Sequence, residues 1–563
     1  MDIKKIFMTG LFFAMALVGY GQNEGNEGYV IDETGVCTIS TAQGLLNFNY
    51  RYEDLRKVHN INKLVFNDGT YDLTNDNWIS NIEIAYSVSG GGATIRFTST
   101  SDDNSHATGL FKSIVGSDEG ISIENLKIEA KIEDGKSDGQ SDFLYLGALA
   151  NKIEGGKRGP VTIGKVAVSA IEGNTVGIHI GERQTENYVG GIIGQIDTYT
   201  GNVIIESCTS SIPIVVEKGK DLCNNYVGGI VGDVSNSDVA IDMCTNMSEI
   251  SVSPASSDQI TYVGGILGSN ISGRDLTISA CIHSGKINVT AARDFAMGGI
   301  VGYLQNANQK STISACANHG ELNMGYSQDY TYIQGYVGGL VGEISSSESA
   351  NTIISNCYID KPISVADQII SKLNQSIEGG AERQLYSSVY VGKVFCSNAD
   401  LFISNVFLYF SNAIPYQSYA NMIDYYYDQT TTTESFNLVS SNEYNNYPDN
   451  DNRMFSSGEV AYKLNKGTIR EEYPYVYFVQ KLRENGDSYP KLYFESEDLE
   501  NEVVYKECKE GGSSISYTNE NSHNIDNPFG VCSVCHEVDP LSAGNETLDV
   551  EVVDGNVDFC DVM

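Results

Sequence analysis

A seven-residue pattern that returns at regular intervals constrains this chain more than any other feature of its sequence. The pattern is Tyr-Val-Gly-Gly-Ile-x-Gly, and its clear copies begin 38, 36, 34 and 40 residues apart. Such a period is typical of repeat architectures, in which each unit buries its apolar face against the next unit. The clear copies are Tyr188–Gly194, Tyr226–Gly232, Tyr262–Gly268, Ala296–Gly302 and Tyr336–Gly342, and worn copies begin at Tyr145 and Tyr390.

Further fixed positions follow each copy and indicate β-strands. A cysteine follows every clear copy, an isoleucine lies three places before it, and two apolar residues lie six and eight places after it. Apolar, mostly β-branched residues two apart lie on one face of a strand. The paired glycines predict a bend or a close backbone approach, where a Cβ would clash. The cysteines are Cys208, Cys244, Cys281, Cys316 and Cys357, and the apolar pairs are Ile214/Val216, Ile250/Val252, Ile287/Val289, Leu322/Met324 and Ile363/Val365.

The repeats predict a β-solenoid, a chain wound into stacked turns. A unit of about 36 residues with several short strands fits two turns of roughly 18 residues each, so about ten turns would span on the order of 50 Å. Equivalent cysteines would then lie roughly 10 Å apart, beyond the ~7 Å limit for a disulfide. We therefore expect the repeat thiols to be small, buried hydrophobic groups in a column. Cys223 and Cys396 lie outside this column, and no partner is predicted for either.

These units resemble the GLUG repeats of secreted bacterial surface proteins, whose hallmark is a heptad of the form YVGGLVG. The resemblance is strong over Tyr188–Val365 and weak over Asp32–Ala150. It implies an all-β, right-handed parallel β-helix similar to pectin-lyase-like domains, as in gut-type Bacteroidetes surface proteins. In the weaker part, Thr41–His59 resembles a capping helix, Leu64–Leu73 a first turn, and Gly109–Ala130 the turn that precedes GLUG units.

Composition divides the rest of the chain. A secretory signal peptide is predicted by Lys4 and Lys5, the apolar run Ile6–Val18 and a small-residue site, and this apolar run is too short to span a bilayer.

After the repeats, we expect a short helix at Ser457–Gly467 and an edge strand at Ser488–Phe494, which together cap the open end of the solenoid. The expected parts are a signal peptide (1–21), an N-terminal cap with the first turns (22–150), the repeat solenoid (151–400), the last turns with a C-terminal cap (401–505), a small Cys/His module (506–540) and an acidic linker (541–563).

The acidity of the chain limits its partners. It has 73 acidic and 35 basic residues, which gives a net charge of −38. Phosphate-rich surfaces repel such a chain, which argues against nucleic acid and anionic membranes as partners. No later apolar stretch reaches the ~18 residues of a membrane helix. We therefore expect no transmembrane segment in the mature chain, and export to the cell surface or the extracellular space.

The expected Cys/His module has the ligand types of a tetrahedral zinc site in Cys508, His523, Cys532 and Cys535. Their spacing matches no standard zinc finger, and His536 is an alternative to His523 as the fourth ligand. In an oxidising compartment the thiols can instead form disulfides, although a Cys532–Cys535 bridge would be strained, or they can remain free. In each case the expected role is structural, because so small a module needs a staple.

The sequence predicts no catalytic site. Some proteins of the resembled family are immunoglobulin-A-cleaving metallopeptidases, but the only His-Glu pair here, His536-Glu537, lacks the second His of H-E-x-x-H. Polysaccharide lyases and hydrolases also use β-helices, yet the candidate acids Asp238, Asp242 and Glu206 take different places in the repeat and form no clear pair.

We therefore expect a non-catalytic, adhesin-like scaffold that presents an extended surface to glycans or to host or cell-surface proteins. A groove between turns that is lined by tyrosines can bind sugar without cutting it. The alternative function is that of a carbohydrate-active enzyme, a polysaccharide lyase or hydrolase.

Overall fold

The computed structural model describes two compact units, Met1–Tyr444 and Asn445–Met563. The described residues are 27–102, 105–135, 143–181, 186–217, 223–253, 260–271, 274–290, 294–306, 310–327, 334–346 and 351–359, with shorter segments from 361 to 520. The predicted signal peptide and acidic linker lie outside them.

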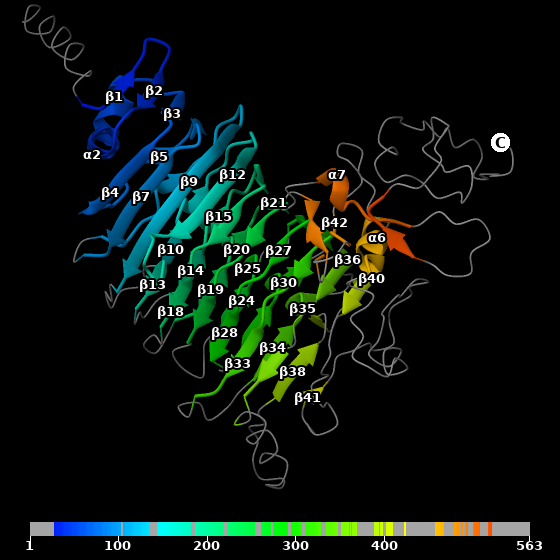
Figure 1. Cartoon of the computed structure of the whole chain (residues 1–563). Helices are drawn as coiled ribbons and strands as arrows, with labels where there is room; N and C mark the ends of the chain where they lie inside the picture. Colours follow the sequence, from blue (N-terminus) through cyan, green and yellow to red (C-terminus); the bar gives the residue numbers. More distant parts are fainter. Residues whose placement is uncertain are drawn as a thin grey trace, which may run out of the picture. The chain divides into compact units, whose positions relative to one another are not determined.

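The first unit is built from three sheets that the chain visits in turn. Figure 1 shows their strands following one another in chain order, from blue β1 to yellow-green β41. Every described strand pairing in this unit is parallel except that of β1 with β2. Repeated visits to the same sheets with parallel neighbours define a parallel β-solenoid, which confirms the predicted architecture in its coarse form.

The large sheet has 24 strands. They are β1 (Tyr29–Ile31), β2 (Val36–Ile39), β3 (Lys63–Phe66), β4 (Thr70–Asn77), β6 (Ser87–Ser89), β7 (Thr94–Thr100), β9 (Ile121–Asp134), β12 (Val161–Ala170), β13 (Ile178–Ile180), β16 (Asn202–Glu206), β17 (Thr209–Ser211), β18 (Ile214–Val216), β21 (Asp238–Asp242), β22 (Thr245–Asn246), β23 (Ile250–Val252), β26 (Leu276–Ser279), β27 (Ile282–His283), β28 (Ile287–Thr290), β31 (Lys310–Ser314), β32 (Ala317–Asn318), β33 (Leu322–Gly325), β36 (Asn351–Ile359), β37 (Ile363–Val365) and β40 (Leu401–Leu408).

Two smaller sheets complete each turn. The nine-stranded sheet contains β5 (Glu83–Ile84), β8 (Phe111–Ile114), β11 (Ala150–Glu154), β15 (Ile193–Asp197), β20 (Val231–Ser235), β25 (Leu267–Asn270), β30 (Val301–Asn306), β35 (Val341–Ser346) and β39 (Phe395–Ser397). The eight-stranded sheet contains β10 (Leu144–Gly147), β14 (Asn187–Gly190), β19 (Asn225–Gly228), β24 (Thr261–Gly264), β29 (Phe295–Gly298), β34 (Gln334–Gly338), β38 (Ser388–Gly392) and β41 (Met422–Ile423).

One repeat makes one full turn of the solenoid. Tyr188 lies opposite Tyr226, and Tyr226 lies opposite Tyr262, so successive heptads occupy neighbouring strands. The worn copies at Tyr145 and Tyr390 take their places in the same series. The prediction of two turns per repeat is therefore wrong. A single circuit uses the whole repeat because it includes three short strands of the large sheet as well as one strand of each smaller sheet.

This correction changes the spacing of the repeat cysteines. The pairs Glu206–Asp242 and Thr209–Thr245 place Cys208 opposite Cys244, one turn away. Neighbouring cysteines are thus about 4.8 Å apart along the stack, and the expected separation of roughly 10 Å is wrong. The expected burial is confirmed, since all five repeat cysteines are buried and free.

A corner of the large sheet precedes each cysteine. The residue directly before the cysteine, or before its equivalent in other turns, has left-handed backbone geometry although it is not glycine. Such geometry costs a side-chain-bearing residue about 1–2 kcal/mol, so it persists only where the stack imposes it. The corner residues are Asn125 (φ 59°), Lys165 (53°), Ser207 (52°), Met243 (52°), Ala280 (50°), Ala315 (53°) and Asn356 (52°).

The paired glycines allow the two smaller sheets to approach closely, as the sequence predicts. A Cβ on Gly228 would lie 1.9 Å from the Val231 carbonyl oxygen and 2.7 Å from the Gly268 nitrogen. A Cβ on Gly229 would lie 2.1 Å from the Asn246 amide nitrogen. The second glycine therefore leaves room for a polar side chain that reaches across from the large sheet. The same relation joins Gly191 to Ser210, Gly265 to His283 and Gly299 to Asn318.

The segment predicted as a helix forms α2 (Ala42–Val58), with Thr41 as its N-cap. The Thr41 hydroxyl accepts a hydrogen bond from the Gly44 amide at 3.0 Å, which satisfies one of the free N–H groups of the first turn. Leu45, Phe48 and Leu55 are buried in the same core cluster as the strands.

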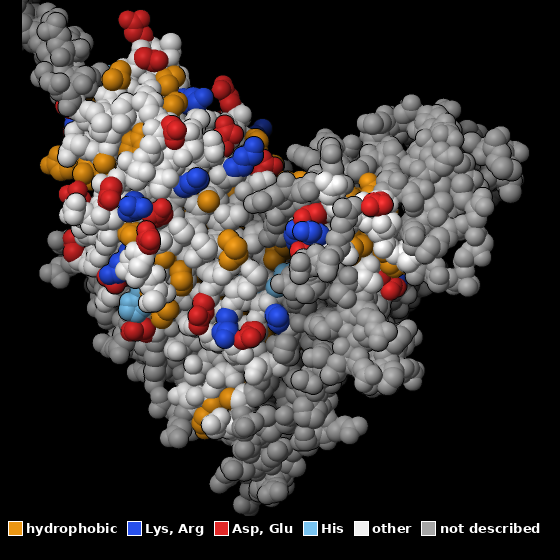
Figure 2. All heavy atoms as spheres, in the orientation of Figure 1, with side chains coloured by type: hydrophobic (Ala, Val, Ile, Leu, Met, Phe, Trp, Pro, Cys, Tyr) orange, Lys and Arg blue, Asp and Glu red, His pale blue; other side chains and the backbone are white. Residues whose placement is uncertain are grey.

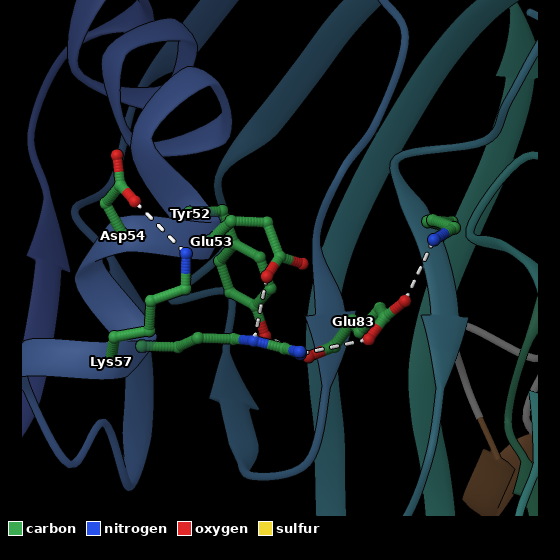
Figure 3. A network of polar contacts seen from close by, with 7 residues as sticks. Tyr52, Glu53, Asp54, Lys57 and Glu83 are labelled. Carbon is green, nitrogen blue, oxygen red and sulfur yellow. Dashed lines mark hydrogen bonds and ion pairs between the residues drawn. The ribbon is translucent and has the colours of Figure 1, made fainter.

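Polar contacts join α2 to the first turns of the solenoid, as Figure 3 shows. The Glu83 carboxylate pairs with Arg56 of α2 at 3.0 Å and with Lys112 of β8 at 2.9 Å. The hydroxyl of Tyr52 donates to the Glu83 carbonyl. The hydrogen bond from Lys112 and the charge of Arg56 lower the pKa of Glu83, so this carboxylate stays ionised as the centre of the network.

The second unit contains two short helices and two hairpins among its described residues. Its elements are α6 (Glu459–Lys466), β42 (Phe478–Val479) paired with β43 (Lys491–Leu492), α7 (Leu499–Glu502), and β44 (Tyr505–Lys506) paired with β45 (Tyr517–Thr518). The helix predicted at Ser457–Gly467 is present as α6, and the predicted edge strand is reduced to β43. The Asn519 amide donates to the carbonyls of Gln480 and Val503, which holds the unit together.

Candidate functional site

The first position of each heptad forms a column of tyrosines along the eight-stranded sheet. We call Tyr145, Tyr188, Tyr226 and Tyr262 the tyrosine column, and they lie on β10, β14, β19 and β24 in direct register. The register follows from the repeat, because equal spacing returns the same position to the same place in each turn. Ala296 interrupts the column on β29.

The rings at the N-terminal end of the column stack on one another, whereas Tyr226 and Tyr262 meet edge to face with their ring centres 5.8 Å apart. The ring centres of Tyr145 and Tyr188 are 5.1 Å apart with an interplanar angle of 22°. Those of Tyr188 and Tyr226 are 4.7 Å apart at 12°. At the interruption Tyr303 of β30 fills the space and stacks on Tyr262 at 4.2 Å and 4°. Because Tyr188 has a ring on each face, the inner rings contact each other and leave little ring surface for a ligand.

A second column of polar side chains runs beside the tyrosine column on the nine-stranded sheet. The polar column consists of Lys152, Gln195, Asp233, Ser269, Tyr303 and Glu343. Asp233 is fully buried, and its carboxylate accepts hydrogen bonds from Gln195 at 3.0 Å and from the hydroxyls of Ser235 at 2.6 Å and Ser269 at 2.5 Å. These bonds cross three consecutive turns and fix their register.

Burial controls the charges of both columns. It raises the pKa of Tyr145 to about 12, with help from Asp197, and it raises those of Tyr188 and Tyr226 as well. The phenols therefore remain neutral hydrogen-bond donors. Burial also raises the pKa of Asp233 against its three hydrogen bonds. Burial and the nearby Asp294 raise the pKa of Glu343 to about 7.

The polar column offers no carboxylate pair for glycoside cleavage. Asp233 and Glu343 are three turns apart, about 14 Å at the usual strand spacing. Paired catalytic carboxylates of glycosidases lie about 5–9.5 Å apart. These two buried acids are therefore too distant to act together on one glycosidic bond.

The N-terminal end of the tyrosine column differs from its interior, because the eight-stranded sheet starts at β10. We call Phe143, Tyr145 and Lys152 the aromatic end. The side chain of Phe143 is 51% exposed, and its ring centre lies 6.3 Å from that of Tyr145 and 6.3 Å from that of Tyr188. The Lys152 ammonium lies 4.9 Å from the centre of the half-buried Tyr145 ring.

Charged groups border the aromatic end. Lys152 lies 3.7 Å from a carboxylate oxygen of Glu154 and 3.7 Å from one of Asp197. Around Tyr145, the aromatic end thus combines the exposed Phe143 ring with an ammonium group and the two carboxylates paired with it, which gives apolar surface together with hydrogen-bond donors and acceptors. This is the combination that places and orients a polar organic ligand.

The candidate acids of the enzyme alternative are placed differently from the prediction. Glu206 and Asp242 lie directly opposite each other on β16 and β21, so the prediction that they take different places in the repeat is wrong for this pair. Both are two residues before a repeat cysteine, a correspondence that a comparison by repeat position reveals. Asp238 belongs to another column, opposite Asn202. The Asp242 carboxylate accepts a hydrogen bond from Ser279 of the next turn.

The predicted metal ligands Cys508, His523, Cys532 and Cys535, together with the alternative His536, lie outside the described residues. Among the residues that the structure does describe, no group of three or more His, Cys, Asp or Glu side chains is placed to hold a metal ion.

Sequence reasoning missed the aromatic end and the polar column. The residue directly after each heptad belongs to the polar column, and this regularity is visible once the heptads are aligned. Phe143 gives no such signal, because it precedes a worn copy of the repeat and its importance depends on where the sheet starts.

The fold defines the class of this chain, a repeat protein of the parallel β-solenoid type. Comparisons with protein-family models, with curated proteins and with solved structures find no match. Among the described helices, none is long and apolar enough to cross a bilayer.

Proposed function

We propose that the chain is an exported, non-catalytic scaffold that binds glycans at the aromatic end of its solenoid. The observation that carries the proposal is the exposed Phe143 ring beside the stacked tyrosine column and the Lys152 charge network. The proposal keeps the resemblance to GLUG-repeat surface proteins, a capping role for α2 and for the second unit, and a structural zinc or disulfide site at the C-terminus.

The chemistry of the aromatic end suits a sugar ring. One face of a sugar carries C–H groups, which pack on an aromatic ring as other apolar surfaces do. Its hydroxyls both donate and accept hydrogen bonds, which Glu154, Asp197 and Lys152 can satisfy from the border of the site. The column behind Phe143 holds Tyr145 in place by stacking, so little conformational entropy is lost on binding.

Charge favours a neutral glycan over an anionic one. The chain has a net charge of −38, and the single ammonium group at the aromatic end is already paired with two carboxylates. Figure 2 shows acidic and basic side chains interspersed among uncharged ones on the face that it draws, with no broad basic patch among the described residues there. An anionic polymer would meet repulsion with little local compensation.

The test is a binding screen of the mature chain against immobilised neutral and acidic glycans, with chromatographic analysis of the products. We expect binding of neutral glycans without shortening of the sugar chains. Phe143→Ala should weaken binding about fivefold or more, because truncating a central aromatic contact typically costs above 1 kcal/mol. Tyr50→Ala is the matched control, since Tyr50 is an aromatic residue 87% exposed on α2, away from the column.

Three outcomes would count against the proposal. Equal binding by the Phe143→Ala variant would remove the aromatic end as the site. Binding of cell-surface proteins with no glycan binding would replace the ligand class. Shortened sugar chains would replace the scaffold with an enzyme.

The competing function is a carbohydrate-active enzyme, and the in-register pair Glu206 and Asp242 is the observation that favours it. Two carboxylates on adjacent strands start about 4.8 Å apart, close to the separation in retaining glycosidases. If the screen shows shortened chains, Glu206→Gln and Asp242→Asn should each abolish cleavage. Asp238→Asn, which changes an acid outside this pair and opposite Asn202, should leave cleavage intact.

A further inference from the structure

The five repeat cysteines form one straight column inside the solenoid. We call Cys208, Cys244, Cys281, Cys316 and Cys357 the thiol column. Flanking strand pairs place each one opposite the next, and Val166 and Val406 continue the column at its two ends. All five side chains are completely buried.

Each thiol is held by hydrogen bonds at the left-handed corner. Cys244 donates to the Asp242 carbonyl at 3.2 Å and faces the Ile205 carbonyl of the preceding turn at 3.6 Å. The other four cysteines repeat this pair of contacts. The corner thus turns carbonyl groups toward the core, and an S–H group satisfies them where a valine cannot. The expectation that these residues serve only as small hydrophobic groups is therefore incomplete.

The spacing of the column also suits disulfide bonds between neighbours. In-register residues on adjacent parallel strands have Cα atoms about 4.8 Å apart. Disulfides join Cα atoms that are about 4.4–6.8 Å apart, so every neighbouring pair falls inside this range, and the Cβ atoms have to move from about 4.8 Å to about 4.5 Å or less for the bond to close. Cysteines two turns apart, such as Cys208 and Cys281, are separated by roughly 9.6 Å and fall outside it.

Neighbouring thiols already influence one another. The amide of Cys316 donates to the sulfur of Cys357 at 3.4 Å. Burial raises the pKa of Cys208 and Cys281. Against the same burial, S–H donors on both sides lower the pKa of Cys244 to about 5. Neighbouring turns therefore bring their thiols close enough to interact through hydrogen bonds.

We propose that the thiol column is a redox modification site in which neighbouring turns are joined by disulfide bonds when the exported chain folds in the presence of a disulfide oxidant. One thiolate attacks the S–S bond of the oxidant, forms a mixed disulfide and releases one oxidant thiol. The neighbouring thiol then loses its proton and displaces the second oxidant thiol. Two protein thiols are oxidised to one disulfide, and one oxidant disulfide is reduced to two thiols.

Burial determines at which stage of folding this reaction can occur. An oxidant cannot reach the sulfurs once the turns have closed, so oxidation belongs to the folding chain or to turns that open. A folded chain made under reducing conditions keeps all five thiols, as in the structure.

The column has an odd number of members, which restricts the products. Two disulfides between neighbours leave a single thiol. Whichever pairs form, that thiol is Cys208, Cys281 or Cys357, and it is never Cys244 or Cys316.

The experiment refolds the mature chain with a mixture of oxidised and reduced glutathione, and in parallel with reductant only. Free thiols are alkylated in denaturant, and the digested chain is mapped by mass spectrometry. We expect disulfides only between neighbours of the column after oxidative refolding. Cys37 is the buried control outside the column, because it lies opposite Leu64 and should form no bridge to column members.

A substitution sharpens the test. Cys281→Ser keeps a hydroxyl donor for the inward carbonyl and divides the column into two pairs, so Cys208–Cys244 and Cys316–Cys357 should form as the only column bridges. The matched variant Cys244→Ser isolates Cys208, which should stay a thiol. The proposal would be overturned if oxidatively refolded chains have a native circular dichroism spectrum but keep all five column thiols reduced. Disulfides between cysteines two or more turns apart would also overturn it. Mapping of the unsubstituted chain decides the question if a variant fails to fold.

Discussion

The N-terminal turns, residues 27–134, and the heptad turns, residues 187–344, share one hydrophobic core but are stabilised in different ways. The N-terminal turns contain most of the largest fully buried side chains, namely Trp78, Tyr29, Phe48, Phe66, Phe97 and Phe111. The heptad turns are built on glycine, valine, isoleucine and cysteine. Their sheets approach so closely at the glycines that a single added carbon would clash.

Polar contacts differ in kind between the two regions. In the N-terminal turns Arg56, Arg96 and Lys112 each join a carboxylate across turns or from the helix. The heptad turns also contain a cross-turn ion pair, Lys286 with Glu321, and in addition they are connected by buried hydrogen-bonded columns such as the one around Asp233. An irregular stack therefore needs individual large contacts, whereas a regular one gains the same small contact in every turn.

The largest expected effect tests the close packing of the heptad turns. In Gly228→Ala the new Cβ would lie 1.9 Å from a backbone oxygen and 2.7 Å from a backbone nitrogen, neither of which can rotate away. We expect a loss of about 3 kcal/mol in the free energy of unfolding, measured by urea denaturation. Gly135→Ala, directly after the last residue of the N-terminal turns, is the control, because nothing lies within 4 Å of its added Cβ. Equal losses of unfolding free energy in the two variants would contradict the close packing described for the heptad turns.

A second prediction concerns buried charge in the heptad turns. The pKa of Glu343 is about 7 in the folded chain against an ordinary value of 4.5. Its contribution to stability is present below pH 4.5 and is lost as the pH rises toward 7, because the unfolded chain releases the proton first. Glu343→Gln should therefore raise stability at pH 8 by up to roughly 3 kcal/mol and have little effect at pH 4.

Thermal unfolding at the two pH values measures this effect. Glu119→Gln, an exposed residue of the N-terminal turns, is the control and should give no difference between them. A pH-independent effect of Glu343→Gln would show that its carboxyl group is not buried as described.

The smallest expected effect tests the ion-pair network of the N-terminal turns. The pKa of Glu83 is lowered, so its contribution is present at neutral pH and is lost as the pH falls through the lowered value. Glu83→Gln should cost about 1 kcal/mol at pH 7 and nothing in strong acid, by urea denaturation. Asp54→Asn removes the exposed pair with Lys57 on the same helix and should cost less. A larger loss of stability in Asp54→Asn than in Glu83→Gln would mean that Glu83 does not connect α2 to the solenoid.

Several elements were predictable because they depend on local rules. The period of the heptads gave the repeat units, the β-branched pairs gave β18, β23 and β28, and Thr41 marked the start of α2. The clash that excludes a Cβ at the paired glycines also follows from their fixed position.

The number of turns per repeat was not predictable from the period. The number of turns depends on how many corners one circuit contains. The corners could not be recognised in the sequence, because residues such as Lys165, Met243 and Ala280 carry no signal for left-handed geometry. Because two turns per repeat were expected, the predicted distance between neighbouring cysteines was one turn too long. Disulfide bonds within the thiol column were therefore not predicted. The aromatic end escaped prediction for a similar reason, because it depends on where the eight-stranded sheet begins.

The equality of one repeat and one circuit has a consequence for how such a molecule changes over generations. Duplication or loss of a unit lengthens or shortens the stack by a single step of about 4.8 Å and leaves both termini intact. Each inserted unit also supplies its own aromatic ring, corner and sulfur, in register with those already there. The reach of the protein can thus be adjusted in small increments while the surface at its N-terminal end is inherited unchanged.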